Sequence, residues 1–379
     1  MSDWVSEHAK RIAERAERDL EALVAVSSPS GDVAGAEECV AVLGALAPTA
    51  AEIERLSCSS PGHADDLLLR LTGTGTRRLL LLGHLDTVVD HGSHRPLRRD
   101  GDGRLVGSGT IDMKGGDVLA LGVLEALAAR RGDFAEAALL LVCDEEWRSA
   151  PFRHAAAFAG WDACLCFEAG QRTADGDEAV IVRRKAAATL HVTAAGRAAH
   201  SGSAPDRGAN ALLALAEAAL AVAAAHAPGG PDALTAVPTI VRSGEAFNVV
   251  PDGGELYCDL RSLRTDAFEE VRALVPAAVG GVTLTAEFAR LWPAMDTRER
   301  SAPLLRAAGE LLGRPVVGAG RGGASDASHF APSIPLTIDG LGPRGGGAHA
   351  GDEHVLAASL HPRAEVALAL TAAVLAGAA

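Results

Sequence analysis

Five short segments of this 379-residue chain place a carboxylate or an imidazole where it could bind a metal ion. They are GHLDTV, GSGTIDMKGG, CDEEW, CFEAG and AHAGDEHV, and they supply His84, Asp86, Asp112, Glu145, Glu146, Glu168 and His349. Imidazole and carboxylate ligands without thiolates suit borderline divalent cations, and catalytic sites of this kind keep a position open for water. The five segments together predict a hydrolase with two metal ions.

Each segment taken alone has a simpler interpretation. His84 and Asp86 lie two residues apart, so in a strand one could bind a metal while the other donates or accepts a supporting hydrogen bond, but such a pair also occurs in surface loops. Asp112 precedes a glycine-rich turn, where it could cap a helix or bridge two cations. Glu145 and Glu146 are adjacent carboxylates, which are costly to bury without cations. They are either a solvated strand end or a metal ligand beside a general base.

Aliphatic runs precede three of these segments. We expect strands at 78–83, 137–143 and 161–167, and the candidate residues follow directly after each of them. Helical patterns at 3–26, 33–46 and 116–130 alternate with these strands, as in βαβ units. Because the carboxyl ends of parallel strands form the ligand-binding edge of an open α/β sheet, the sequence predicts one site there.

The chain is long enough for two domains. From residue 185 the pattern becomes strand, helix, two strands, helix and strand, at 187–195, 207–226, 235–242, 254–263, 266–279 and 281–290. This order resembles a ferredoxin-like module. We therefore expect an α/β catalytic domain with a mainly parallel sheet, formed by 1–184 and 294–379. It would be interrupted by an α+β lid and dimerisation domain at 185–293.

Composition excludes some classes of function. The formal net charge of −14 argues against a non-specific nucleic-acid binder, which needs a basic surface. Hydrophobic residues make up 48% of the chain, yet no stretch has the roughly 18 uninterrupted apolar residues of a membrane span. The N-terminal segment is charged and lacks a signal-peptide core. We expect a soluble cytoplasmic protein without nucleic-acid or membrane partners.

The motifs resemble those of the dinuclear zinc aminoacylase/carboxypeptidase family, which includes glutamate carboxypeptidase, acetylornithine deacetylase and succinyl-diaminopimelate desuccinylase. The resemblance covers essentially the whole chain, and GHLDTV followed by GSGTIDMKGG is its most specific part. It implies that Asp112 bridges two ions, that His84 and Glu168 complete one site, and that Glu146 and His349 complete the other. Zinc is the expected metal, and cobalt or manganese would suit the same ligands.

The resemblance also implies roles around the metals. Asp86 would orient His84, and Glu145 would be the general base. The segment AAHSGSAPDRGANAL resembles the family's lid, in which a histidine, here His200, polarises the scissile carbonyl from the partner subunit of a dimer. Four further residues are candidates for binding the substrate, two from the lid and two from a glycine-rich loop: Asn248, Arg261, Arg321 and Ser325.

The predicted reaction is hydrolysis of an amide next to a free carboxylate, with Glu145 activating a water bound between the ions. The substrate would be a small N-acyl amino acid or peptide, and the lid sequence favours the glutamate-carboxypeptidase branch. Two alternatives stay open: a biosynthetic deacylase that removes an acyl or aminoacyl protecting group, and a non-catalytic metal-binding homologue. A Ser/His/Asp hydrolase is disfavoured because the chain lacks a GxSxG elbow.

Overall fold

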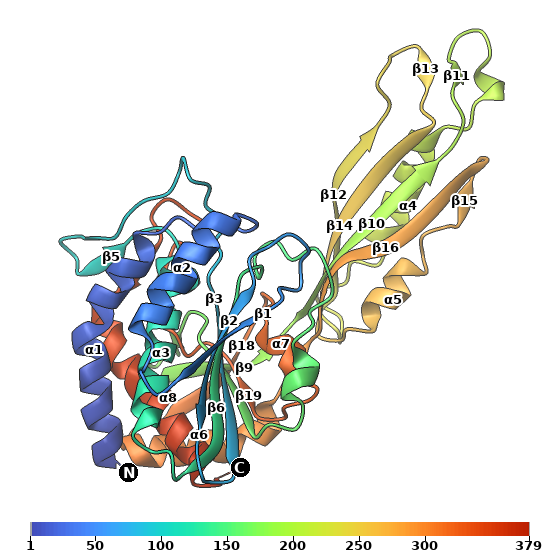
Figure 1. Ribbon diagram of the computed structural model, residues 1–379. Coiled ribbons are helices and arrows are strands. Elements are labelled where there is room, and N and C mark those ends of the chain that lie inside the picture. The colour runs from blue at the N-terminus through green and yellow to red at the C-terminus, as the bar shows by residue number, and fades with distance from the viewer. Residues whose placement is uncertain (1, 379) are drawn as a thin grey trace. The chain divides into compact units, whose positions relative to one another are not determined.

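The computed structural model describes residues 2–378, and they divide into two compact units (Figure 1). Unit 1 contains Met1–Arg183, Asp296–Arg321 and Ser325–Ala379, and unit 2 contains Arg184–Met295 with Gly322–Ala324. The main segment of unit 2 nearly coincides with the predicted insert at 185–293. The sequence of unit 1 is thus interrupted by one long segment that belongs to unit 2.

Unit 1 is built on a six-stranded sheet with the order β1-β2-β6-β3-β7-β19. The strands are β1 (Glu52–Leu56), β2 (Asp66–Thr72), β3 (Arg77–His84), β6 (Phe134–Val142), β7 (Ala163–Cys166) and β19 (Thr337–Ile338). The four strands from β6 to β19 are parallel to one another, whereas β2 runs antiparallel to both of its neighbours, β1 and β6. The expected mainly parallel sheet is confirmed.

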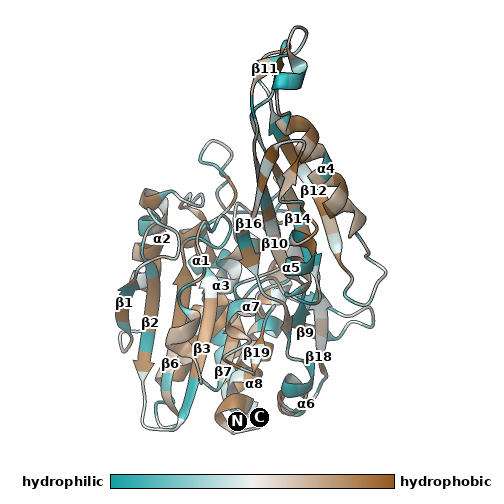
Figure 2. Cartoon of the chain, turned by 90° about the vertical axis from the view of Figure 1, so that its right-hand side faces the viewer, coloured by the Kyte–Doolittle hydropathy of each residue, from teal (hydrophilic) through white to brown (hydrophobic). Residues whose placement is uncertain are grey.

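The core of unit 1 is aliphatic. Strands β3 and β6 are buried on both faces, which explains their continuous leucine-rich runs (Figure 2). The packed helices are α1 (Ser2–Val24), α2 (Val33–Leu46), α3 (Gly115–Ala128), α6 (Arg298–Leu312) and α8 (Leu360–Leu375). Helix α1 buries one apolar stripe, while α3 and α8 are buried on almost every side.

Short strands complete unit 1. Strand β9 (Glu178–Arg184) lies between β18 (Val316–Arg321) and β17 (Met295–Asp296), and also pairs with β8 (Gln171–Arg172). A second small sheet has the order β20-β21-β5-β4. Its strands are β20 (Gly345–Gly346), β21 (His354–Leu356), β5 (Arg104–Val106) and β4 (Arg98–Arg99). Because β21 pairs with β5, this second sheet connects the loop before β21 to the segment before α3. Local sequence patterns did not predict this pairing.

Unit 2 contains an antiparallel sheet with the order β12-β14-β10-β16-β15. Its strands are β10 (Ala186–Ala195), β12 (Thr235–Ser243), β14 (Gly253–Ser262), β15 (Ala278–Val279) and β16 (Val282–Trp292). Its helices are α4 (Ala211–Ala224) and α5 (Ala267–Arg272). The expected α+β insert is confirmed, although α5 is shorter than the predicted helix at 266–279. A small hairpin pairs β11 (Ala199–His200) with β13 (Val249–Val250).

None of the helices within residues 2–378 combines the length and the apolar character that crossing a membrane requires.

Candidate metal centre

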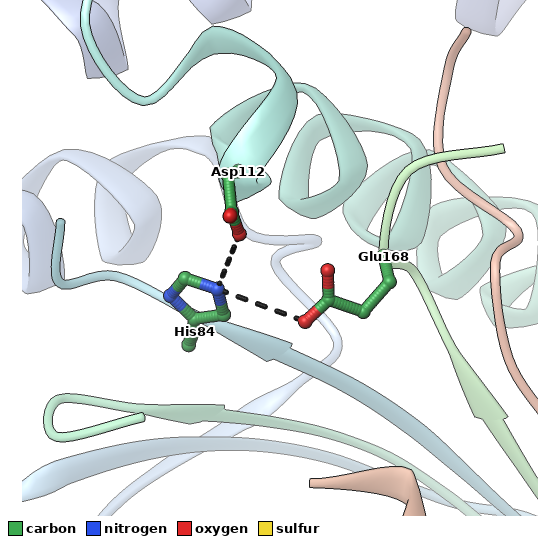
Figure 3. Close-up of side chains that lie close together, drawn as sticks. All are labelled: His84, Asp112 and Glu168. Carbon is green, nitrogen blue, oxygen red and sulfur yellow. Dashed lines mark hydrogen bonds and ion pairs between the residues drawn. The ribbon is translucent and has the colours of Figure 1, made fainter. Parts of the chain in front are cut away.

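Two groups of potential ligands meet at the carboxyl edge of the large sheet. One contains His84, Asp112 and Glu168, and the other contains Asp112, Glu146 and His349. Within each group the ligand atoms all lie within 4.8 Å of one another, and Asp112 belongs to both. Figure 3 shows His84 at the end of β3, with its ring directed toward the Asp112 and Glu168 carboxylates. The structure thus brings together the residues of both predicted ligand sets, with Asp112 common to the two groups, and their binding of two ions stays a prediction.

The His84 ring has a defined orientation. Its Nδ1 lies 3.0 Å from the backbone carbonyl oxygen of Asp86, which can only accept, so Nδ1 carries the proton. Its Nε2 lies 3.1 Å from Asp112 Oδ1 and 3.8 Å from Glu168 Oε1. A metal between these oxygens would therefore meet the lone pair of Nε2.

Asp86 supports more than the His84 ring. Its carboxylate lies 3.4 Å from His84 Nδ1, and it also accepts the backbone N–H groups of Glu145, at 3.1 Å, and Glu146, at 3.0 Å. One buried side chain thus ties the end of β3 to the turn that follows β6. We predicted only an effect of Asp86 on His84, and the bonds to both glutamate backbones are additional.

Glu353 holds the turn that presents Asp112. This buried carboxylate accepts the backbone N–H groups of Gly109, Ile111 and Asp112 at 2.8, 2.9 and 3.1 Å. Three such bonds satisfy a buried charge and leave the turn little freedom. Glu353 was absent from the predicted site, because its sequence context marks it only as a loop residue.

The rest of the Met-Lys-Gly-Gly motif is structural. The buried Lys114 Nζ donates to the carbonyls of Leu23, at 3.2 Å, and Val26, at 2.8 Å, and so caps the C-terminal end of α1. A Cβ atom on Gly116 would lie 1.9 Å from the carbonyl oxygen of Phe167, the residue before Glu168. Only glycine permits this close approach, which sets α3 against the segment carrying Glu168.

His349 has a strained backbone. Its φ of 64° lies in the left-handed region, which is uncommon for a residue with a side chain. In this conformation its Nε2 lies 3.0 Å from Asp112 Oδ2 and 3.2 Å from Glu146 Oε1. Hydrogen bonds to these two carboxylates raise the pKa of His349 to about 10. The imidazole therefore occupies a position where cationic charge is strongly favoured.

The charges of the cluster fit two divalent cations. Five carboxylates gather around two imidazoles: Asp86, Asp112, Glu145, Glu146 and Glu168 beside His84 and His349. Burial, reinforced by neighbouring carboxylates, raises the pKa of Glu146 above its usual value. Buried like charges at this density are costly unless protons or metal ions neutralise them. The donor set of nitrogen and oxygen atoms suits zinc, cobalt or manganese.

Glu145 differs from its neighbour. Its carboxylate belongs to neither group of ligands, and no hydrogen bond or ion pair within residues 2–378 engages it. Burial raises the pKa of Glu145 well above its usual value, and the carboxylates of Asp326 and Glu168 add to the effect. The side chain is therefore available to accept a proton.

A buried ion-pair network fixes the turn after Glu146. Arg148 donates both Nη groups to the Asp326 carboxylate and also binds Asp144 through Nε and Nη2. All three side chains are almost fully buried. Removing one partner of such a network strands a buried charge and typically costs about 3–5 kcal/mol. The network was missed, because Arg148 and Asp326 are 178 residues apart in the sequence.

Two predicted substrate-binding residues lie in unit 1: Arg321 is the last residue of β18, and Ser325 follows it closely in the sequence. Arg321 Nε donates to the Gln171 side chain at 3.0 Å and its Nη2 to the Gly170 carbonyl at 3.4 Å, which places it beside the Glu168 segment. Ser325 is fully buried and its hydroxyl donates to Asp339 at 2.5 Å. In the structure this hydroxyl supports the fold, and its predicted contact with a substrate stays a prediction.

Three predicted residues lie in unit 2. His200 is exposed, and its Nδ1 accepts the backbone N–H groups of Gly202 and Ser203, both at 3.1 Å. Nδ1 is therefore unprotonated and Nε2–H remains as a donor. Asn248 is exposed in the same hairpin, and Arg261 on β14 is paired with Asp259 at 3.0 Å. Their predicted contacts with a substrate stay predictions.

Comparison with known proteins decides the family. Residues 80–373 match the model of Peptidase family M20/M25/M40. The chain belongs to this family. Carboxypeptidase G2 of Pseudomonas sp. (strain RS-16) is 29% identical over 370 residues, which span 91% of this chain and 86% of that protein. Succinyl-diaminopimelate desuccinylase of Rhodopseudomonas palustris (strain BisA53) is 40% identical over 103 residues, or 25% and 27% of the two chains.

A solved structure agrees at the level of the fold. The aminopeptidase PepT from Bacillus cereus ATCC 10987 gives a TM-score of 0.72 at 20% identity, covering 96% of this chain and 98% of that one. The predicted family membership is confirmed, and this M20 protein is a metal-dependent hydrolase of the metallopeptidase, carboxypeptidase-related type. The groups around Asp112 are its candidate metal-binding residues.

Proposed function

We propose that this M20 enzyme hydrolyses an amide bond next to a free carboxylate, as a carboxypeptidase or an N-acyl-amino-acid deacylase. The observation that carries the proposal is the pair of ligand groups sharing Asp112, with the uncommitted carboxylate of Glu145 beside them. Two divalent ions, with zinc preferred over cobalt or manganese, would supply Lewis acidity and lower the pKa of a bound water.

Residues of the chain itself would transfer the proton, position the metal ligands and bind the substrate. Glu145 accepts the proton of the attacking water and passes it to the leaving amine, which its raised proton affinity favours. Asp86 and Glu353 hold His84 and Asp112 in place through bonds to buried backbone groups. Arg321, beside Gly170, binds the free carboxylate of the substrate. Together these groups position an amide and move one proton across it.

His200 donates its Nε2–H to the carbonyl oxygen of the scissile amide, and in our proposal it acts from the partner subunit of a homodimer. Unit 2 carries an apolar surface suited to such a dimer. Leu213 and Leu220 on α4 and Val241 on the edge strand β12 are 62%, 74% and 58% exposed. Apolar side chains gathered beside an unpaired strand edge favour association with a second copy.

The role of His200 can be tested by mixing two variants that are each expected to have low activity. His200→Ala should lower turnover about 10²- to 10³-fold, as expected for the loss of one oxyanion donor. If His200 acts across the dimer, co-refolded His200→Ala and Glu145→Gln subunits recover activity, because one site of each heterodimer has both groups. No recovery from verified heterodimers would place His200 in its own subunit, and an unchanged rate for His200→Ala would remove it from the reaction.

A substrate panel tests the function itself. Chelator-stripped protein is assayed with N-acetyl amino acids and dipeptides, with and without zinc, cobalt or manganese. Each substrate is compared with its C-terminal amide, which has the same shape without the negative charge. We expect metal-dependent hydrolysis that falls about 10-fold or more for the amides, because a charge-assisted hydrogen bond is lost. Equal rates for acids and amides would contradict the requirement for a free carboxylate.

The same panel separates the remaining candidates. Slow cleavage of all dipeptides with fast cleavage of one class of N-acyl amino acid would favour a biosynthetic deacylase. Two bound ions without hydrolysis of any substrate would favour a non-catalytic homologue. The unligated Glu145 argues against that last candidate, because a purely metal-binding protein has no use for it.

A further inference from the structure

The turn 144–149, which carries the proposed general base Glu145, is closed by Ser60. The Ser60 N–H donates to the Asp144 carboxylate at 2.9 Å, and the Ser60 Oγ accepts the Ser149 backbone N–H at 2.9 Å. Both ends of the turn are bound to one residue, so its residues move together. The position of the base therefore depends on what holds this turn to the rest of unit 1.

Arg148 connects this turn to a distant segment of unit 1. Its two Nη groups donate to the two carboxylate oxygens of Asp326, with Nη2 at 2.7 Å, and its Nε donates to Asp144 at 3.1 Å. The guanidinium carbon lies 4.7 Å from the centre of the Phe152 ring, which stacks on His329 at 4.8 Å. Hydrogen bonds in its plane and a ring against its face fix the guanidinium, and a lysine ammonium could not reproduce both.

Asp326 is a firm anchor because other contacts hold its own segment. The hydroxyl of the preceding residue, Ser325, donates to the buried Asp339 carboxylate at 2.5 Å, and Asp326 itself leads into the short helix α7 (Ala327–Phe330). Asp326 is also near the base. Burial raises the pKa of Glu145, and among the neighbouring carboxylates Asp326 raises it most. The anchor of the turn thus belongs to the surroundings of the base itself.

The network is costly to bury, which argues against a purely stabilising role. Asp144 and Asp326 share the single guanidinium of Arg148, and all three side chains are at most 4% exposed. Burial lowers the pKa of His329 to about 4, so this imidazole is neutral and adds no second positive charge. Neutral side chains of similar shape often give equal or higher stability than such a buried set of charges. The placement that the network enforces therefore explains it better than stability does.

We propose that Arg148 is a positioning residue, which locks the turn of the general base to Asp326 and so fixes the Glu145 carboxylate relative to the two ligand groups. The inference rests on the proposed function and adds a residue that belongs to neither group. Asp86 holds the backbone N–H groups of Glu145 and Glu146, and Arg148 holds the other end of the same turn. Because a misplacement of about 1 Å can cost about 10²-fold in rate, loss of one anchor should lower kcat without removing a ligand.

The experiment compares variants that break the network in different ways. Arg148→Lys keeps the charge but not the planar fork, and Arg148→Met removes both. The triple variant Asp144→Asn/Arg148→Met/Asp326→Asn leaves no stranded charge. Arg70→Met is the matched control, because Arg70 on β2 also binds two carboxylates and lies outside both ligand groups. We measure kcat, KM, metal content and melting temperature of each variant, with the best substrate of the panel.

We expect both single Arg148 variants to lower kcat about 10²-fold, with KM and metal content close to those of the wild-type protein. The triple variant should recover melting temperature relative to Arg148→Met, because no buried charge is left unpaired, but it should keep the low kcat. A merely structural network would instead let kcat recover together with stability. Arg70→Met should change the melting temperature at most.

A normal kcat in any folded Arg148 variant, the triple variant included, would overturn the inference. So would a loss of kcat that follows a loss of metal, or an effect confined to KM. In each of these cases hydrolysis by the wild-type protein still upholds the proposed function. Absence of hydrolysis by the metal-loaded wild-type protein would remove both.

Discussion

We expect Glu145→Gln to lower turnover by at least about 10²-fold while leaving two metal ions bound. The carboxylate of Glu145 lies outside both ligand groups, so its replacement by an amide of the same shape removes a proton acceptor without removing a ligand. General base catalysis typically contributes about 10²- to 10⁴-fold, and we expect kcat to fall within or beyond that range. Metal content by mass spectrometry and steady-state rates on the best panel substrate provide the measurement.

Glu146→Gln is the matched control for this prediction. It makes the same chemical change at the adjacent residue, which does belong to a ligand group with Asp112 and His349. We expect this variant to lose one ion, whereas Glu145→Gln keeps both. If Glu145→Gln also lost an ion, Glu145 would be a ligand and the assignment of the base would be wrong. A nearly normal rate with both ions bound would instead require another base.

Asp112→Asn should lose both ions, because Asp112 is the one residue shared by the two ligand groups. An amide oxygen is neutral and cannot offset the charge of two adjacent cations. A metal ion at 100 times its Kd stabilises a folded protein by about 2.7 kcal/mol, so the wild-type melting temperature should rise when metal is added to stripped protein. The melting temperature of Asp112→Asn should respond little to the same addition.

Two comparisons make the Asp112 prediction specific. Glu168→Gln, which affects one ligand group, should retain an ion at the other and show an intermediate shift in melting temperature. Asp102→Asn changes an exposed carboxylate outside both groups and should behave as wild type. Two tightly bound ions in Asp112→Asn would show that the sites do not share this residue.

The sequence alone was sufficient to predict the type of sheet, and it pointed to the candidate ligands that the structure gathers into two groups. Leucine-rich runs are long enough to identify β3 and β6, and parallel strands end at a common edge, so the sequence already predicts that His84 and Glu146 lie together. The alternation of strands and helices likewise predicted the ferredoxin-like insert. These features depend on residues close in the chain, where periodicity and motifs carry the information.

Tertiary structure decided how the ligands are held. Glu353 reaches Gly109 across 244 residues, and Arg148 reaches Asp326 across 178. The loop 349–353, between β20 and β21, likewise reaches Gly107 and Ser108. Local patterns cannot predict such pairings, because each partner alone resembles an ordinary polar loop residue. The sequence determined which groups could do the chemistry, and long-range packing decided which polar groups position them and which remain available to a substrate.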